Sequence, residues 1–174
     1  MMMPTNDMAG IQLLLLDVDG VLTDGSVTYS DMGAEIKTFN VRDGLGLRLL
    51  MKAGVEVGII TGRQSDALLM RCRDLGIELV FQGVKDKSKV FETILTRTKI
   101  PAACTAFMGD DLPDLAVYNN AGLFFTVSGA PFELLSRAHG ITTCKGGHGA
   151  VREVCENILK AKGVWEKIVQ EFLA

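Results

Sequence analysis

The chain has 174 residues and is 48% hydrophobic, which is enough apolar material for one domain with a sizeable core. Its 18 Lys and Arg residues against 21 Asp and Glu residues give a formal net charge of −3, and it has no long basic run. Nucleic acid and anionic membrane surfaces are therefore not expected as partners.

The N-terminus and the cysteines favour a cytoplasmic location. The first seven residues are expected to form a loose leader, and the first basic residue is Lys37, so the cationic region of a signal peptide is missing. The apolar run Leu13–Leu16 is too short to span a bilayer. Four scattered cysteines without a C-x-x-C pair are typical of reduced, mostly buried thiols and do not favour a zinc site.

Short apolar runs alternate with helical patterns along the chain. We predict strands over residues 11–16, 55–60, 79–81, 105–108 and 123–127. We predict helices from an N-cap at Asp43 to Gly54, over 65–75, over 85–98 and near 112–119. This alternation predicts an α/β fold of Rossmann-like type, with a parallel sheet and helices on both faces.

Two segments depart from the alternation. Residues 26–41 alternate β-forming side chains around Asp31, Met32 and Gly33, which predicts a β-hairpin flap after the first strand. Residues 151–174 are expected to form a helix broken at Gly163 and then an amphipathic tail over about 163–174. Without an internal repeat or a linker, residues 1–174 are expected to form a single domain.

Polar clusters follow the predicted strands, where ligands of open parallel sheets bind. In chain order these residues are Asp17, Asp19 and Asp24, then Thr61, Gly62 and Arg63, then Lys87, and then Asp110, Asp111 and Asp114. Each strand is therefore expected to deliver its polar groups to the same edge of the sheet.

Several carboxylates at one edge repel each other unless a cation lies between them. Oxygen ligands favour Mg²⁺, which commonly binds one or two carboxylates together with a phosphate oxygen. A carboxylate can attack phosphorus to form an aspartyl-phosphate, and Asp19 can protonate the leaving oxygen and then activate water. The Thr61 hydroxyl, the Gly62 amide and the Lys87 ammonium group would stabilise the transferring phosphoryl group.

The motifs D-x-D-G-x-L-T, "IITGR", a later lysine and "GDDLPD", in this order, resemble the haloacid-dehalogenase (HAD) superfamily of phosphatases. The resemblance covers nearly the whole chain. It implies that Asp17 is the nucleophile, Asp19 the general acid/base, Thr61 a phosphate-binding hydroxyl and Lys87 the phosphate-binding lysine. It also implies an Mg²⁺ ion bound by Asp17, the Asp19 carbonyl and Asp110, with Asp111 and Asp114 as supporting carboxylates. Lys85 and Lys89 remain alternatives to Lys87.

Neither interval between these motifs leaves room for a cap domain. "FNVRDGLGLRLL", "FQGVKDK" and "GGHGAVREVCE" further resemble the 3-deoxy-D-manno-octulosonate 8-phosphate phosphatases of lipopolysaccharide sugar synthesis. That branch implies an Mg²⁺-dependent homotetramer built through the hairpins, a tail that can reach a neighbour's site, and a sugar-acid phosphate substrate. A sister group acts on the nine-carbon ulosonic acid (KDN) 9-phosphate, and this alternative stays open. Pro113 replaces the asparagine usual in this branch.

The substrate's own carboxylate would need a partner, for which Arg63 and Arg71 are candidates. The backbone N–H groups of residues 146–149, which open a helix, also offer an anion site. Several of these residues have a purely structural alternative. Asp24 can be a turn former, Asp43 an N-cap, Arg71 a solvated helix residue and His148 a loop residue.

Two other classes of protein share parts of this pattern. A phospho-receiver module also uses an aspartyl-phosphate, Mg²⁺, a threonine and a lysine, but its acidic pair and its phosphorylated aspartate come in a different order along the chain. A non-catalytic assembly domain would not need the complete motif set. A phosphatase remains the preferred interpretation.

Overall fold

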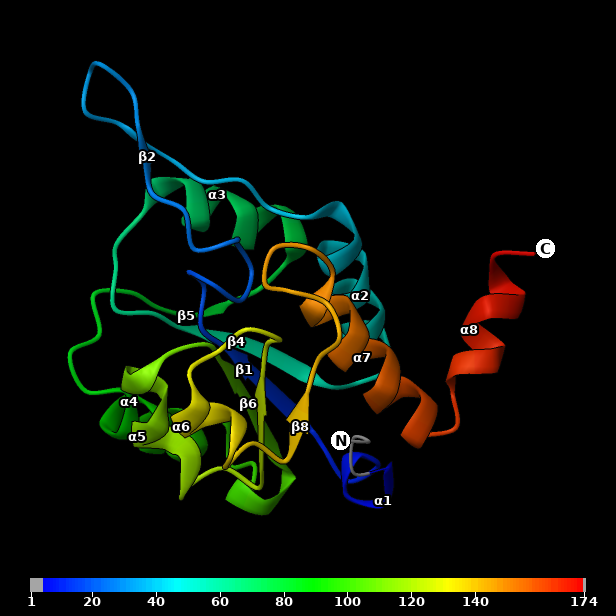
Figure 1. Cartoon of the computed structure of the whole chain (residues 1–174). Coiled ribbons are helices and arrows are strands. Elements are labelled where there is room, and N and C mark those ends of the chain that lie inside the picture. The colour runs from blue at the N-terminus through cyan, green and yellow to red at the C-terminus, as the bar shows by residue number, and fades with distance from the viewer. Residues whose placement is uncertain (1–4, 174) are drawn as a thin grey trace.

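The structure is a computed structural model that describes residues 5–173, so part of the expected leader lies outside the described residues. Six parallel strands form one sheet in the order β5-β4-β1-β6-β7-β8 (Figure 1). The strands are β1 (Leu13–Leu16), β4 (Glu56–Ile60), β5 (Leu79–Phe81), β6 (Thr105–Gly109), β7 (Leu123–Thr126) and β8 (Gly140–Ile141). Within residues 5–173, no helix is long and apolar enough to cross a membrane.

Helices cover both faces of this sheet, as predicted. On one face α2 (Val41–Lys52) packs against α3 (Asp66–Leu75) and α7 (Ala150–Ala161), and on the other α4 (Lys87–Thr98) packs against α5 (Leu115–Tyr118). The remaining helical segments are α1 (Thr5–Met8), η1 (Ala102–Cys104), η2 (Leu112–Asp114), α6 (Phe132–Leu135) and α8 (Trp165–Glu171). The chain thus has the α/β fold that the alternation indicates.

The central strands are buried on both faces, and their sequences explain why. All four leucines of β1 have no exposed surface, and Phe107 of β6 and Phe124 of β7 stack with ring centroids 5.8 Å apart. Strands covered by helices on both sides are expected to be continuously apolar rather than alternating. This apolar layer leaves the ends of the strands as the places where polar side chains can stand.

The predicted hairpin is confirmed. Strands β2 (Thr28–Tyr29) and β3 (Glu35–Ile36) pair antiparallel, and the turn between them includes Gly33 with φ +78°. The hairpin extends away from the sheet (Figure 1). Tyr29 is 62% exposed and Met32 at its tip is 95% exposed.

Two predicted features differ from the structure, and two of its elements were not predicted. Asp43 is not the N-cap of α2, because the helix starts two residues earlier and the Asn40 side chain accepts from the Arg42 N–H. The leader is not loose over its whole length, because residues Thr5–Met8 form α1. Strand β8 and helix α6 were not predicted, because two and four residues are too short to show a period.

Asp43 instead connects two helices. It lies in the first turn of α2, is 1% exposed, and accepts a 2.7 Å hydrogen bond from the Arg152 N–H in the first turn of α7. Burial is the main reason that the pKa of Asp43 lies above its usual range. Asp43 therefore caps α7 from a neighbouring helix.

Candidate active site

The site lies where the direction of the strand order reverses. Strand β1 is flanked by β4 on one side and by β6 on the other, so the loops after β1 and β6 diverge and leave a crevice. Asp17 follows β1 directly and donates its N–H to the Met108 carbonyl of β6 at 2.9 Å. Asp110 follows the last residue of β6. The sheet therefore places these two aspartates side by side.

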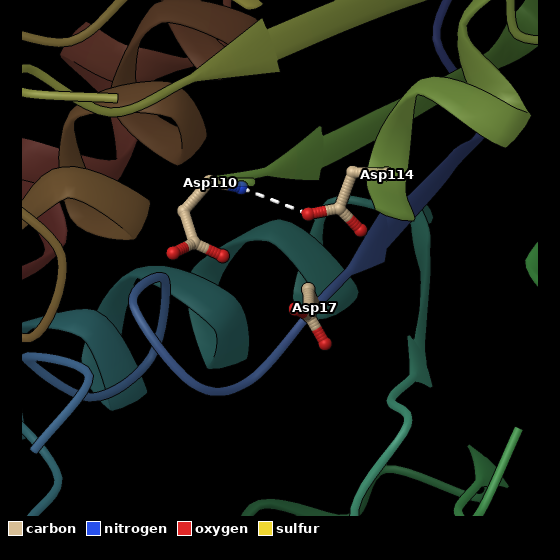
Figure 2. A group of neighbouring side chains, drawn as sticks. All are labelled: Asp17, Asp110 and Asp114. Atoms are coloured by element: carbon tan, nitrogen blue, oxygen red, sulfur yellow. Dashed lines mark hydrogen bonds between the residues drawn. The ribbon is translucent and has the colours of Figure 1, made fainter. Parts of the chain in front are cut away.

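Asp17, Asp110 and Asp114 form what we call the carboxylate cluster. Each of the three offers a carboxylate oxygen, and these oxygens lie within 4.8 Å of one another (Figure 2). Burial, and then repulsion from Asp114, raise the pKa of Asp17 to about 6. Burial, and then Asp17 and Asp114, raise the pKa of Asp110 to about 7. The cluster therefore carries more negative charge than its surroundings stabilise.

Lys87 supplies positive charge to this cluster. It is the first residue of α4 and only 6% exposed, and its Nζ lies 3.1 Å from Asp17 Oδ2 and 2.6 Å from Asp114 Oδ1. Burial lowers the pKa of Lys87, but the two carboxylates raise it by more, so the amine stays charged. Lys85 and Lys89, the alternatives, are both exposed, and Lys89 pairs with Asp86.

The cluster fits a divalent cation. Oδ1 of Asp17 is buried and has no hydrogen-bond partner among the described residues. A buried carboxylate oxygen without a partner is costly, and an all-oxygen donor set is the kind that Mg²⁺ prefers. A cation bound at Asp17 and Asp110 would give Asp17 Oδ1 a partner and would reduce the repulsion between the carboxylates.

The loop after β6 is organised by Asp114. This side chain is 1% exposed, and its Oδ2 accepts from the Asp110 N–H at 3.0 Å and from the Asp111 N–H at 3.3 Å. Asp111 is exposed and forms a capping box with Asp114 around η2, and Pro113 fits in the first turn of that helix. The departure at Pro113 thus leaves the cluster in place, and Asp111 lies outside it.

Gly20 permits the close approach of the two loops. Its φ is +81°, and a Cβ atom added there would lie 2.0 Å from Asp110 Oδ2. A larger side chain at this position would displace Asp110 or the loop. The glycine of the D-x-D-G motif is therefore required by the packing of the carboxylate cluster.

Asp19 lies outside the carboxylate cluster, in what we call the charge ring of Asp19, Lys37, Glu35 and Arg63. Asp19 Oδ1 pairs with Lys37 Nζ, and Oδ2 lies 3.6 Å from Arg63 Nε. Arg63 Nη2 lies 2.6 Å from Glu35 Oε1, and Lys37 Nζ lies 3.6 Å from the same oxygen. Lys37 was not predicted as a site residue, because a single lysine in an alternating strand looks like a solvent-facing residue.

Thr61 and Gly62 follow β4, which is adjacent to β1. Leu16 of β1 pairs with Ile59 of β4, so Asp17 and Thr61 leave the sheet at the same edge. Thr61 is 2% exposed, and its backbone N–H is donated to the Phe81 carbonyl at 3.0 Å. Gly62 is exposed beside it.

Three other predicted candidates are not brought into the cluster. Arg71 donates to the Asn40 carbonyl at 3.2 Å and lies over the ring of Phe39. Asp24 accepts from the Ser26 N–H at 2.9 Å, which is the contact of a turn former. The His148 ring contacts the Gly146 carbonyl at 2.8 Å. His148 also borders a cavity of about 380 Å³ that reaches Asp110.

The backbone N–H groups of Gly147, His148 and Gly149 are engaged within the chain and do not offer the predicted anion site. Gly147 donates its N–H to the Val21 carbonyl, and His148 donates its N–H to the Lys145 carbonyl. A Cβ atom on Gly146 would lie 1.7 Å from the Gly20 carbonyl oxygen. Residues 146–149, which we call the glycine loop, therefore pack against the loop after β1 and support it.

A Rossmann-like sheet with aspartates after β1 and β6, a buried lysine from α4 and no inserted domain within residues 5–173 defines the capless HAD class of fold. No family model matches the sequence. The 3-deoxy-D-manno-octulosonate 8-phosphate phosphatase KdsC of Yersinia pestis is 44% identical over 154 residues, which cover 88% of this chain and 82% of that protein.

Solved structures agree with this match. The 3-deoxy-D-manno-octulosonate 8-phosphate phosphatase from Moraxella catarrhalis, in complex with magnesium, phosphate and KDO, aligns with a TM-score of 0.94 and 39% identity over 97% of both chains. The cobalt-bound phosphatase YrbI of Haemophilus influenzae aligns with a TM-score of 0.92 and 38% identity over 97% of this chain and 99% of that one. The chain belongs to the 3-deoxy-D-manno-octulosonate 8-phosphate phosphatase family.

Proposed function

We propose that the protein is an Mg²⁺-dependent phosphatase that hydrolyses 3-deoxy-D-manno-octulosonate 8-phosphate to the free sugar acid and inorganic phosphate. The observation that carries this proposal is the carboxylate cluster with Lys87, at the point where the strand order reverses, in a chain of this family. We also propose that residues 1–174 act as a single HAD-like domain.

In the proposed first step, a carboxylate oxygen of Asp17 attacks phosphorus and the bond from phosphorus to the sugar oxygen breaks. Asp19 gives a proton to that oxygen, so the sugar leaves as an alcohol. In the second step Asp19 takes a proton from water, whose oxygen attacks phosphorus and releases Asp17 and phosphate. Lys87, the Thr61 hydroxyl and the Gly62 amide neutralise or hydrogen-bond the phosphoryl oxygens.

The residues that would hold Mg²⁺ are Asp17, Asp110 and the Asp19 carbonyl, with Asp114 and Asp111 as supporting carboxylates. When bound, the ion supplies positive charge to the phosphoryl group and lowers the repulsion between the carboxylates. In the protein's own chemistry Lys87 has a second role, because it keeps Asp17 and Asp114 at fixed positions through its two ion pairs.

The substrate's carboxylate is assigned to Arg63 rather than to Arg71. Arg63 is partly exposed beside Asp19, whereas Arg71 is engaged by Asn40 and Phe39. Arginine can bind a carboxylate through two parallel hydrogen bonds. To make this contact, Arg63 would break its ion pair with Glu35 and form one with the substrate's carboxylate.

We propose a cytoplasmic homotetramer. The apolar side chains Val27, Tyr29, Met32 and Ile36 of the hairpin are 47%, 62%, 95% and 52% exposed, and a hairpin edge of this kind favours self-assembly. All four cysteines carry free thiols, of which Cys72 and Cys155 are buried, as suits a reducing compartment.

A panel of substrates tests the proposal. Phosphate release is measured from the eight-carbon sugar-acid phosphate, from the nine-carbon KDN 9-phosphate and from common hexose phosphates. We expect kcat/KM to be highest for the eight-carbon substrate. A preference for the nine-carbon compound would assign the sister activity. A single stoichiometric phosphorylation without turnover would indicate a receiver, and no reaction with any substrate would indicate an assembly domain.

A further inference from the structure

We propose that Lys37, on the strand that returns from the hairpin, is the positioning residue for the general acid/base Asp19. This inference rests on the proposed function of Asp19. Lys37 follows β3 and reaches back to the loop after β1, where its Nζ pairs with Asp19 Oδ1. The hairpin is then part of the catalytic machinery and not only a surface for assembly.

The burial of Lys37 indicates that this pair is built into the fold. The Lys37 side chain is 3% exposed, although its backbone lies in a hairpin that is otherwise largely exposed. Lysine is rarely buried unless its charge is paired. Its ammonium group lies between Asp19 and Glu35, which are 20% and 14% exposed. A surface ion pair would not require this degree of burial.

The two oxygens of Asp19 are treated differently. Lys37 holds Oδ1, whereas Oδ2 is buried without a hydrogen-bond partner among the described residues, with Arg63 Nε 3.6 Å away. Buried polar atoms in native proteins normally have a partner, and the unpaired Oδ2 is the Asp19 oxygen beside Arg63, the residue assigned to the substrate's carboxylate. By fixing Oδ1, Lys37 leaves Oδ2 as the oxygen that exchanges a proton with the leaving group.

The charge ring keeps this arrangement rigid. Its two cations and two anions alternate, and they come from the loop after β1, the returning hairpin strand and the loop after β4. Tyr29 of β2 adds a contact, because its hydroxyl accepts from Arg63 Nη2 at 3.3 Å. Both hairpin strands are therefore attached to the loops that carry the proposed catalytic groups.

The test compares two leaving groups. A sugar alkoxide needs a proton from Asp19, whereas p-nitrophenolate is a stable anion and leaves without one. Because general acid catalysis is worth about 10²–10⁴-fold, we expect Lys37→Met to lower kcat/KM about 30-fold or more on the eight-carbon sugar phosphate. On p-nitrophenyl phosphate we expect kcat/KM to fall less than about threefold, because kcat/KM reports the first step alone, in which p-nitrophenolate leaves without a proton from Asp19.

Three controls accompany this comparison. Lys37→Arg keeps the charge and should restore most of the activity on the sugar phosphate. Lys99→Met removes a charge from an exposed position at the C-terminal end of α4, far along the helix from Lys87, and should change neither substrate's kinetics. In an Asp19→Asn background, adding Lys37→Met should cause no further loss, because the two residues act as one unit. If Lys37→Met does not fold, Lys37→Gln takes its place in all three comparisons.

Equal losses on both substrates would overturn the proposal and leave Lys37 a structural residue, and so would the absence of any loss. If the wild-type protein hydrolyses only another alkyl phosphate, the proposed substrate is wrong. The role of Lys37 is then still tested by comparing the loss of kcat/KM caused by Lys37→Met on that phosphate with the loss on p-nitrophenyl phosphate.

Discussion

Two carboxylates of the site, Asp17 and Asp110, are buried next to other carboxylates, so a bound cation would stabilise their ionised forms. Asp17 and Asp110 are acids whose pKa values are raised from 3.8 to about 6 and about 7. In the absence of metal, the folded protein binds more protons than the unfolded chain from the usual pKa of 3.8 up to the raised values of about 6 and about 7. The contribution of both groups to the free energy of unfolding therefore falls as the pH rises from about 4 to about 7.

Magnesium should reverse this trend. Mg²⁺ requires ionised ligands and releases the protons that Asp17 and Asp110 hold, so its apparent affinity should rise between pH 5.5 and 8. We expect the increase in Tm at a fixed MgCl2 concentration to grow over this range, and EDTA to remove both the increase and the activity. Asp110→Asn should abolish the response to Mg²⁺. A magnesium effect that is the same at pH 5.5 and pH 8 would contradict this assignment.

Asp17→Asn separates chemistry from folding. An amide cannot attack phosphorus, so we expect kcat to fall by at least about 10³-fold. The Tm of the metal-free variant should not fall, because the substitution removes a charge that is buried and repelled by Asp114. Circular dichroism and phosphate release check the two expectations, and retained turnover would rule out Asp17 as the nucleophile.

At the scale of elements, the sheet explains why the loops that carry the sequence motifs lie together. Each motif follows an apolar run that is long enough to be recognised as a strand, and parallel strands bring their ends together. Of the three nearby lysines, Lys87 begins α4, and this start places its side chain beside Asp17. Asp43 was misassigned because an acidic residue near a helix start looks like its N-cap, whereas here it caps α7.

The Asp43 contact has a measurable effect on stability. Asp43→Ala leaves the Arg152 N–H of α7 without its acceptor and should lower the free energy of unfolding by about 1–2 kcal/mol. Asp43→Asn keeps an acceptor and removes the buried charge, so it should be close to wild type or more stable. Urea unfolding of the two variants measures the difference. Equal destabilisation by both would show that the charge, and not the capping bond, is what matters.

At the scale of the whole molecule, the hairpin and the tail extend beyond the body of the sheet. The single-chain sequence indicated both segments, but not their contacts. The charge ring joins residues 18 positions apart, and the glycine loop packs against a segment more than 120 residues earlier. Such pairings follow from the three-dimensional arrangement and have no periodic signal in the sequence.

Assembly through the hairpin can be tested at its tip. Met32→Glu places a charge on a side chain that is 95% exposed and should shift the protein from tetramer toward smaller species in light scattering. Phe132→Glu on α6 is the matched control, because Phe132 is 75% exposed outside the hairpin and should leave the mass unchanged. An unaltered mass for Met32→Glu would place the subunit interface elsewhere.

The tail packs against its own chain through Val164, Trp165 and Ile168, and its last residues are exposed. Ile168 is its buried residue, Glu171 pairs with Lys52 at 2.6 Å, and Phe172 and Leu173 are 68% and 73% exposed. Because no strand of the sheet and no residue of the carboxylate cluster follows Lys162, removing the residues after it should leave both in place and alter KM or product release, if the tail reaches a neighbouring site. Steady-state kinetics with phosphate as product inhibitor measures both. Unchanged constants would limit the tail to packing.

The support of the nucleophile's loop by Gly146 has a consequence for biosynthesis. During translation, the sheet strands and every side chain of the carboxylate cluster leave the ribosome before the glycine loop and α7 that hold the Asp17 loop in place. A nascent chain that stops at β8 contains all the proposed reacting groups without the piece that fixes their spacing. Activity should thus be acquired late, when the glycine loop and α7 emerge.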